Sequence, residues 1–382
     1  MRLKNLSLFV TGSLAMLLFA EAALRALPVA ATPLPDETFH PDFPVDRWQQ
    51  GEPYVYSRGV YLERPHTLYP NDMGMLHGGK ADTGFTLWVH GDSYVEAAML
   101  DFGQTLQGNL TTLAKGSFAV ASVNVSGATL ADYLTGIRLG SGISRRSAHV
   151  VLISAGDLAE SFAPMDKGAP EQSALMVSPD GVRIHLRHGT PRPSAPLLSM
   201  RTIWKVARKS ALFRYVYLNI KFQPTNLLKS GANNRAALKE SASADTVPDY
   251  YPKGVAALLD SIASASSHVL FLVDCNRAAL AKSLLEGKAV LPPRRDTLAA
   301  IFENIARARN IPVVDMCPIF ADWMARNRRT LDFRPADAHW DKDAQALAAN
   351  AAFAILSEKR WLPAPGQKVS LPDSRAATNP QP

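Results

Sequence analysis

The sequence predicts an α/β protein built on a doubly wound parallel sheet of about five strands. Short apolar runs recur along the chain, and stretches with helical periodicity lie between them. A strand that helices cover on both faces is apolar on both sides and therefore reads as a continuous apolar run. Alternating strand and helix units indicate parallel strands joined by crossover helices. This pattern predicts a flavodoxin-like sheet, whose ligands bind beyond the carboxyl ends of the strands.

The strands are expected at five places along the chain: residues 85–90, 118–124, 149–154, 268–274 and 311–315. Three clear helical stretches are expected at residues 255–265, 297–309 and 343–356. The third and fourth strands are separated by residues 155–267, which is far more than one crossover helix requires. The sequence therefore predicts an insertion at about residues 160–250, near the strand ends.

Two elements are expected inside this insertion. Residues 176–186 have a Ser-Pro-Asp-Gly turn between apolar runs, which predicts a hairpin. Residues 199–222 form a helix candidate whose basic side chains include Arg201, Lys205, Arg208, Lys209 and Arg214. This basic helix is interpreted either as a solvated face or as a cap over the substrate or a membrane surface.

The remaining boundaries follow from composition. Residues 32–83 are rich in Pro, Gly and aromatic residues without a clear period, which indicates a linker at the domain edge. Residues 84–361 then form the α/β domain, and the Pro-rich tail at residues 362–382 is expected to be disordered.

The N-terminus, residues 1–31, has the pattern of an export signal. Arg2 and Lys4 precede an uncharged, mostly apolar run at residues 6–20, and Glu21 and Arg25 follow it. The segment serves either as an uncleaved single-pass anchor or as a signal peptide that is removed. Both interpretations place the domain outside the cytoplasm, on the periplasmic side of the inner membrane or free in the periplasm.

Composition and motifs exclude several classes of protein. A net charge of +7 is spread over the 382 residues and is no nucleic-acid footprint. The chain lacks the H-E-x-x-H, Walker A and G-x-S-x-G motifs, so zinc peptidases, P-loop NTPases and common α/β-hydrolases are poor candidates. The cysteines, Cys275 and Cys317, each end a predicted strand and are either a disulfide or two buried thiols.

Ser93 is the first candidate for chemistry. It follows Gly91 and Asp92 where the first strand meets a helix, beside amides that can stabilise an oxyanion. A serine at this place is often only a helix N-cap.

His339 and Asp337 are the second candidate. A serine hydroxyl needs a base, and a neutral histidine needs a carboxylate to hold its tautomer. Asp337 precedes His339 by two residues on a loop, although 244 positions separate Asp337 from Ser93. The competing interpretation is that Asp337 or Asp341 only caps the following helix.

From about residue 67 to 356 the sequence resembles the SGNH hydrolases, also called the GDSL family. Gly91-Asp92-Ser93 resembles the first block, which supplies the nucleophile and one oxyanion amide. Asn124-Val125-Ser126-Gly127 resembles the second, which makes the Gly127 amide another oxyanion donor. Asp337-Ala338-His339-Trp340 resembles the block with the base and its orienting acid, in the D-x-H-W form of exported bacterial members. The anchor-like Glu21-Ala22-Ala23-Leu24-Arg25 fits those members too.

The third block departs from the family pattern. Where the family has Asn-Asp-Leu, this chain has Gly156-Asp157-Leu158, so the third oxyanion donor is at most the Gly156 backbone N–H. An ionised Asp157 in the asparagine's place would repel the developing charge. Losing one such donor typically costs about 10²–10³-fold in rate, unless another side chain such as Asn124 replaces it.

The resemblance implies an exported serine esterase or O-acyltransferase. Ser93, His339 and Asp337 are the expected catalytic residues, and no metal or organic cofactor is expected. The expected substrates are O-acyl groups of an envelope or exported polysaccharide, with small esters still open. The alternative is a catalytically silent carbohydrate-binding or assembly component of an envelope polysaccharide system. Beside the site, His90 and Trp340 are expected to pack, and Asp92 to brace the turn.

Overall fold

The structure is a computed structural model. It describes residues 3–33, 36, 43–79, 81, 84–144, 146–154, 156–167, 173–186, 206–220, 247–293, 296–333 and 337–363. The chain divides into two compact units, which are described separately below. Unit 1 comprises Met1–Leu34, Gln49–Pro70 and Pro191–Ala244, and unit 2 comprises Pro35–Trp48, Asn71–Thr190 and Asp245–Pro382.

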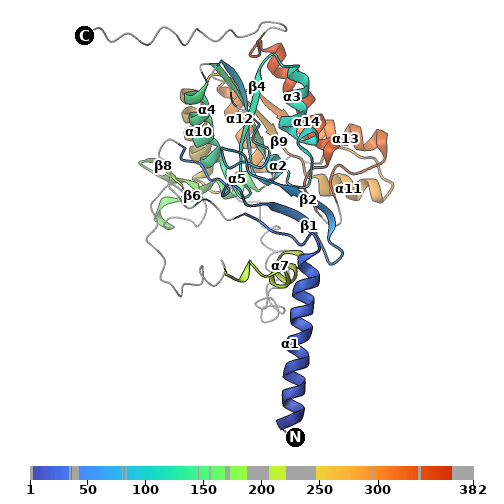
Figure 1. Cartoon of the computed structure of the whole chain (residues 1–382). Helices are drawn as coiled ribbons and strands as arrows, with labels where there is room; N and C mark the ends of the chain where they lie inside the picture. Colours follow the sequence, from blue (N-terminus) through green and yellow to red (C-terminus); the bar gives the residue numbers. More distant parts are fainter. Residues whose placement is uncertain are drawn as a thin grey trace, which may run out of the picture. The chain divides into compact units, whose positions relative to one another are not determined.

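Unit 2 contains the predicted parallel sheet (Figure 1). Its strands are β3 (Phe85–Gly91), β4 (Ala119–Asn124), β5 (Arg146–Ile153), β9 (Val269–Val273) and β10 (Val313–Asp315). They are ordered β10-β9-β5-β3-β4, and every neighbouring pair is parallel. This is the doubly wound order expected from the sequence, and each predicted strand overlaps an observed one. The carboxyl ends of β3, β5 and β9 therefore meet at one edge of the sheet.

Helices cover both faces of this sheet (Figure 1). One face packs against α3 (Leu106–Ala114), α11 (Arg277–Leu285), α13 (Met316–Asn327) and α14 (Lys342–Glu358), and the other against α4 (Leu130–Ile143), α10 (Tyr251–Ala265) and α12 (Thr297–Ala308). The side chains of β5 divide between the two cores: Val150 and Leu152 join the first, and Val151 and Ile153 the second. Because both faces are apolar and buried, the strands appear in the sequence as unbroken apolar runs. The three predicted helices are confirmed as α10, α12 and α14.

A second, smaller sheet in unit 2 joins β6 (Phe162–Pro164), β7 (Ala174–Ser178) and β8 (Gly181–His185). Strands β7 and β8 are antiparallel and joined by the Pro179–Asp180 turn, which confirms the predicted hairpin. Shorter helical turns are α2 (Ser93–Glu96), η1 (Phe102–Gln104), α5 (Asp157–Glu160) and η2 (Met165–Lys167).

Unit 1 consists of α1 (Leu3–Arg25), the antiparallel pair β1 (Tyr54–Arg58) and β2 (Glu63–Leu68), the short helix α7 (Ala211–Arg214) and the π-helical turn η3 (Tyr215–Asn219). The segment expected to be a linker at residues 32–83 thus contains a hairpin that the sequence did not predict. Of the helix expected at residues 199–222, the described part is residues 206–220. It is helical at 206–207, turns at 208–210 and continues as α7 and η3, so it is not one regular α-helix. The expected insertion is divided between the two units. The expected disordered tail lies outside the described residues from residue 364 onward.

Cys275 and Cys317 form a disulfide with their Cα atoms 4.7 Å apart. They lie two residues beyond Val273 and Asp315, which are paired in the parallel β9–β10 ladder. Their proximity therefore follows from the strand register, and it resolves the alternative that the sequence left open.

Replacing both cysteines by alanine is expected to lower the free energy of unfolding. The bond closes a loop with a sequence separation of 42 residues, and a loop of that size restricts the unfolded chain by about 4 kcal/mol. Denaturant unfolding of the double variant and of the wild type measures the difference. A loss below about 1 kcal/mol would contradict a structural role for this bond.

Candidate active site

Ser93 lies at a sharp turn between β3 and α2, at the carboxyl end of the sheet. The turn is tight at Gly91, where an added Cβ would lie 2.3 Å from the Val95 side chain. Asp92 caps the helix by accepting a hydrogen bond from the Tyr94 N–H at 2.9 Å. This confirms its expected bracing role. The N–H of Ser93 belongs to the first helical turn, whose amides have no acceptor within the helix.

The loop that carries His339 is fixed by the helix that follows it. Asp341 caps α14 by accepting hydrogen bonds from the N–H groups of Asp343 and Ala344, both at 3.0 Å. On the first turn of α14, the fully buried Gln345 donates to the Tyr94 carbonyl oxygen at 2.8 Å. It also accepts from the Leu106 N–H at 2.8 Å. These contacts tie the helix after the histidine loop to the turn that carries Ser93.

Ser93, His339 and Asp337 form a continuous chain of hydrogen bonds. His339 Nε2 lies 2.7 Å from Ser93 Oγ, and His339 Nδ1 lies 2.5 Å from Asp337 Oδ1. The same carboxylate oxygen accepts the His339 backbone N–H at 3.0 Å. The Asp337 side chain is 4% exposed and that of His339 22% exposed. The structure therefore brings the Ser93 hydroxyl to a histidine that lies 246 positions later in the sequence, together with the Asp337 carboxylate on the same loop as that histidine.

This arrangement determines which proton transfers are possible. A carboxylate at Nδ1 favours the tautomer with its proton on Nδ1, which leaves the Nε2 lone pair facing the Ser93 hydroxyl. The serine proton can then pass to Nε2, and the resulting imidazolium is stabilised by Asp337. Asp337 does not cap α14, because Asp341 does so.

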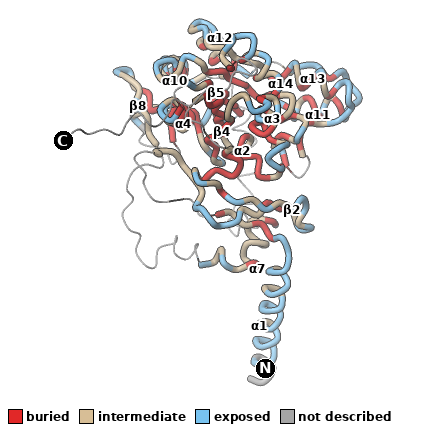
Figure 2. Tube along the Cα trace, turned by 45° about the horizontal axis from the view of Figure 1, so that its top comes forward, coloured by how far each residue is buried: buried red, intermediate tan, exposed pale blue. Residues whose placement is uncertain are grey.

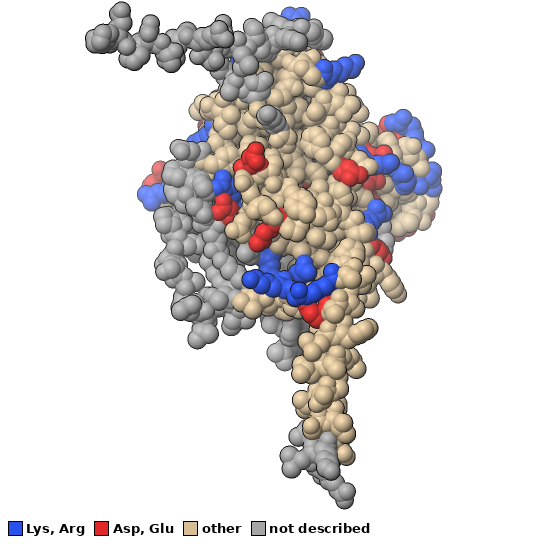
Figure 3. Space-filling view, viewed as in Figure 1, with Lys and Arg blue, Asp and Glu red and all other residues tan. Residues whose placement is uncertain are grey.

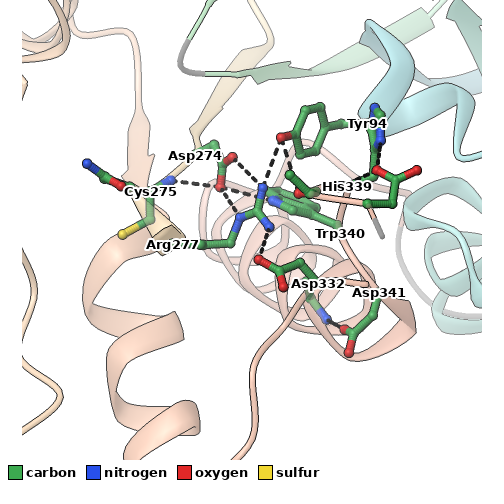
Figure 4. Close-up of polar contacts among 12 residues, drawn as sticks. Tyr94, Asp274, Cys275, Arg277, Asp332, His339, Trp340 and Asp341 are labelled. Atoms are coloured by element: carbon green, nitrogen blue, oxygen red, sulfur yellow. Dashed lines mark hydrogen bonds and ion pairs between the residues drawn. The ribbon is translucent and has the colours of Figure 1, made fainter. Parts of the chain in front are cut away.

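Tyr94 and a buried arginine hold the histidine loop through a network of polar contacts (Figure 4). The Arg277 guanidinium lies between Asp274 and Asp332, with nitrogen–oxygen distances of 3.2 and 3.3 Å, and donates to the Tyr94 hydroxyl at 3.0 Å. That hydroxyl donates to the Ala338 carbonyl oxygen at 3.4 Å. The centroid of the Tyr94 ring lies 4.8 Å from that of the His339 ring. Burial raises the pKa of Tyr94 to about 12, so the phenol stays a hydrogen-bond donor.

A cavity of about 380 Å³ reaches this part of the molecule through Tyr94 and Ala338, whereas Ser93, His339 and Asp337 are not among its lining residues. Its lining mixes polar and apolar groups, among them Tyr94, Ser154, Asp274, Arg277, Asp296 and Ala338. It lies where β5 and β9 end, and proteins with a doubly wound sheet bind their ligands beyond the carboxyl ends of the strands. Among the described residues, no group of three or more His, Cys, Asp and Glu side chains is arranged to hold a metal ion.

Gly127, the second expected oxyanion donor, lies on an exposed loop after β4 with a φ of +81°. The preceding residue anchors this loop: Ser126 donates its N–H to Glu96 at 3.0 Å, and its hydroxyl also donates to that carboxylate. Glu96, from the Ser93 turn, is 1% exposed and accepts a further hydrogen bond from the Trp48 indole at 2.5 Å. Glu96 thus joins the loops that carry the two candidate oxyanion amides.

The third expected donor position is occupied by glycine, as the sequence indicated. Gly156 is exposed at the start of α5 and provides no side chain. Asp157 is buried, and its carboxyl group accepts from the Ser154 N–H at 2.8 Å and the Tyr133 hydroxyl at 3.1 Å. Burial raises the pKa of Asp157 well above its ordinary value, and Asp92 adds to this. These two hydrogen bonds hold the carboxyl group in the interior, where burial disfavours its ionised form.

Asn124, considered as a replacement donor, is 1% exposed and donates to Ser122 within β4 at 2.7 Å. This contact holds its amide nitrogen within β4. His90 is fully buried and pairs with His149 at 3.0 Å, and burial lowers its pKa to about 3. Trp340 is fully buried and donates to Asp274 at 2.9 Å. Both therefore have the packing roles expected of them.

Sequence reasoning missed Glu96, Tyr94, Arg277 and Gln345. Their partners are far away in sequence: Arg277 contacts Tyr94 across 183 positions, and Gln345 contacts Tyr94 across 251. No local pattern identifies such pairs. The sequence offered one signal for Glu96: it is a charged residue among the otherwise mostly apolar residues that follow Ser93.

Glu96 is expected to make stability depend on pH. Burial raises its pKa from 4.5 to about 7. The nearby Asp92 also raises this pKa, whereas the hydrogen bonds from Ser126 and Trp48 lower it. Between these values the folded protein keeps a proton that the unfolded chain has lost. Stability therefore falls as the pH rises through this window, by about 1.4 kcal/mol per pH unit and about 3 kcal/mol in total. Above the folded pKa the loss is complete.

The Glu96→Gln variant lacks this titration and serves as the reference. The difference in unfolding free energy between wild type and variant is measured by denaturant unfolding from pH 4.5 to 8. Over this pH range the wild type should lose about 3 kcal/mol of unfolding free energy relative to the variant. A difference that stays constant with pH would show that Glu96 is ionised throughout.

A search against protein-family models and a search of curated proteins find no match. Solved structures do resemble the chain. A lipolytic G-D-S-L family member from Veillonella parvula is 10% identical over 72% of this chain and 98% of its own, with a TM-score of 0.34. The esterase EstA from a Pseudoalteromonas species is 13% identical over 73% and 98%, with a TM-score of 0.33. A two-domain esterase active on acetylated mannans is 10% identical over 75% and 54%, with a TM-score of 0.37. The fold assignment rests on the sheet order itself.

Proposed function

We propose that this protein is an SGNH-type serine esterase or O-acyltransferase, held at the periplasmic face of a membrane by α1. The observation that carries the proposal is the hydrogen-bonded chain from Ser93 through His339 to Asp337. A serine hydroxyl paired with a base, which a buried carboxylate orients, is the arrangement that nucleophilic acyl transfer requires.

In the first half-reaction Ser93 Oγ forms a bond to the acyl carbon, and its proton passes to His339 Nε2. The carbonyl electron pair moves onto oxygen, and the N–H groups of Ser93 and Gly127 stabilise that charge. The intermediate collapses as its bond to the departing alcohol breaks, and His339 returns the proton to the leaving oxygen. Water or a sugar hydroxyl then attacks the acyl-enzyme, with His339 as base, and Ser93 is restored.

The substrate class follows from the resemblance and from α1. The D-x-H-W block and the anchor pattern are similar to those of exported bacterial members, so we propose O-acyl groups of an envelope or exported polysaccharide as substrates. The helix supports this setting: Ser7–Arg25 has a mean hydropathy of 1.8, which suffices to cross a membrane or to act as a signal sequence.

The glycine at position 156 favours a second candidate: a protein of the same fold that binds polysaccharide without catalysis. An active-site fluorophosphonate separates the two. The esterase proposal expects the full chain to be labelled at Ser93, as mapped by peptide mass spectrometry, and His339→Ala to abolish labelling. A chain that the probe does not label, or labels equally without His339, would overturn the proposal.

Introducing Asn at Gly156 is expected to raise the rate of ester hydrolysis, by up to about 10²-fold, if this position faces the oxyanion. The backbone there, with φ −75° and ψ −35°, accommodates any residue, and an added Cβ would lie 3.5 Å from its nearest contact, Glu160 Oε1. Gly156→Ala is the matched control because it adds a Cβ without a donor. Equal rates for the Asn and Ala variants would place Gly156 outside the oxyanion site.

A further inference from the structure

The helix α1 is exposed along its length in unit 1 (Figure 2). Its apolar side chains are largely exposed, including Leu8 at 73%, Phe9 at 72% and Phe19 at 75%. The 19 residues of Ser7–Arg25 span about 28 Å as a helix, close to the thickness of a bilayer's hydrocarbon core. If α1 crosses a bilayer, its Arg25 end lies at the membrane–water interface.

Glu21 fixes a second segment at that end of α1. It lies four residues before Arg25, about 6 Å along the helix. Its carboxylate accepts hydrogen bonds from the Ser210 hydroxyl at 2.7 Å and from the N–H groups of Ala211 and Leu212 at 3.1 and 2.9 Å. A carboxylate at the edge of hydrocarbon is costly unless it has partners. Arg25 on the same helix donates to this carboxylate at 2.7 Å, and residues 210–212 supply its other partners. This segment therefore lies at the depth of Glu21.

Further contacts within unit 1 hold both ends of this segment, residues 206–220. Thr32 follows α1 in the chain, and Arg208 donates to its carbonyl oxygen at 2.5 Å. Asn219 accepts from the Ala30 N–H at 3.0 Å and donates to Ser57 at 2.9 Å. The segment is thus attached to the chain just beyond α1 and to β1.

The composition of this part of unit 1 suits a membrane interface. Outside α1, ten large apolar side chains of the described residues are exposed, and six belong to unit 1: Leu27, Val60, Tyr61, Tyr69, Val206 and Ile220. The unit also has twice as many basic as acidic side chains among those described: Arg25, Arg58, Arg64, Arg208, Lys209 and Arg214 against Glu21, Glu52 and Glu63. Figure 3 shows Lys and Arg side chains gathered where α1 ends. Apolar and aromatic groups mixed with basic ones are typical of interfacial segments.

We propose that residues 206–220 form an interfacial segment that lies in the headgroup layer of the bilayer that α1 enters and binds the phosphates of anionic phospholipids. Val206 and Ile220, which are exposed at the two ends of the segment, lie in the headgroup layer, and Lys209 faces the phosphates. The inference rests on the proposed membrane anchoring but not on the chemistry at Ser93. An esterase assay therefore tests the proposed chemistry at Ser93, and a measurement of lipid contact tests the proposed interfacial segment.

The experiment uses the full chain reconstituted into vesicles, with a single cysteine introduced at Val206 or at Ile220 and labelled with an environment-sensitive fluorophore. The native cysteines form a disulfide and are not labelled. A quencher attached near the lipid headgroup reports contact. Leu285→Cys is the matched control, because Leu285 is 83% exposed in unit 2. Vesicles of phosphatidylcholine alone are compared with vesicles that also contain phosphatidylglycerol.

We expect quenching at residues 206 and 220, stronger with phosphatidylglycerol, and none at residue 285. Lys209→Glu should remove part of the phosphatidylglycerol effect, whereas Lys282→Glu, on α11, should not. Labels at 206 and 220 that behave like the label at 285 would overturn the proposal. Equal quenching in both lipids would overturn the anionic headgroup assignment.

Discussion

Replacing Ser93 by alanine is expected to lower the turnover of a short-chain aryl ester by at least about 10⁴-fold, because it removes the hydroxyl that His339 Nε2 contacts and that would form the acyl-enzyme. Binding and the oxyanion amides would leave only a small residual rate. The full chain in detergent is assayed for turnover and for thermal unfolding.

Ser264→Ala is the matched control, since this serine lies exposed on α10 and bonds only its own helix, at the Asp260 carbonyl oxygen. It should keep the wild-type rate. A Ser93→Ala variant that stays folded and retains a rate within tenfold of the wild type would remove the nucleophile from the proposal.

Replacing Asp337 by asparagine is expected to cost about 10³–10⁴-fold in turnover with little change in stability. The amide can donate to Nδ1 and so favours the tautomer whose proton is on Nε2. That nitrogen then cannot accept the serine proton. Fluorophosphonate labelling of Ser93 should slow in parallel, because both reactions depend on the same base.

Asp341→Asn is the matched control on the same loop. Asp341 caps α14 through two backbone N–H groups, so the variant should lose up to about 1 kcal/mol of stability and keep its turnover. Equal losses of turnover in the two variants would indicate that Asp337 only stabilises the loop.

Buried strands were the part of the fold that the sequence predicted best. They lie between two helical layers, so both of their faces are apolar, and a run such as residues 269–273 is too short for a typical helix and long enough for a strand. The hairpin β1–β2 escaped prediction because its second strand, Glu63–Leu68, is mostly exposed and has no apolar alternation. The pairing of Cys275 with Cys317 needed the β9–β10 register, which composition does not contain.

The candidate site divides in the same way. Ser93, Asp337 and His339 could be located from the sequence because each lies in a short motif at a strand or helix end. Glu96 and Arg277 could not, because what distinguishes them is burial against partners that only folding brings near, such as Ser126 and Asp332. The loss of the third oxyanion side chain at Gly156 was visible in the sequence. The burial of the Asp157 carboxyl group against Tyr133 was not visible, because it depends on a contact that only folding makes.

The most direct test of the central claim is to trap the acyl-enzyme. The full chain is mixed with an aryl acetate, quenched in acid during the first turnover, and digested for peptide mass spectrometry. The account predicts an acetyl group on Ser93 that hydroxylamine removes and that is absent from His339→Ala. An acetyl group on another residue, or rapid hydrolysis without any acetylated peptide, would contradict it.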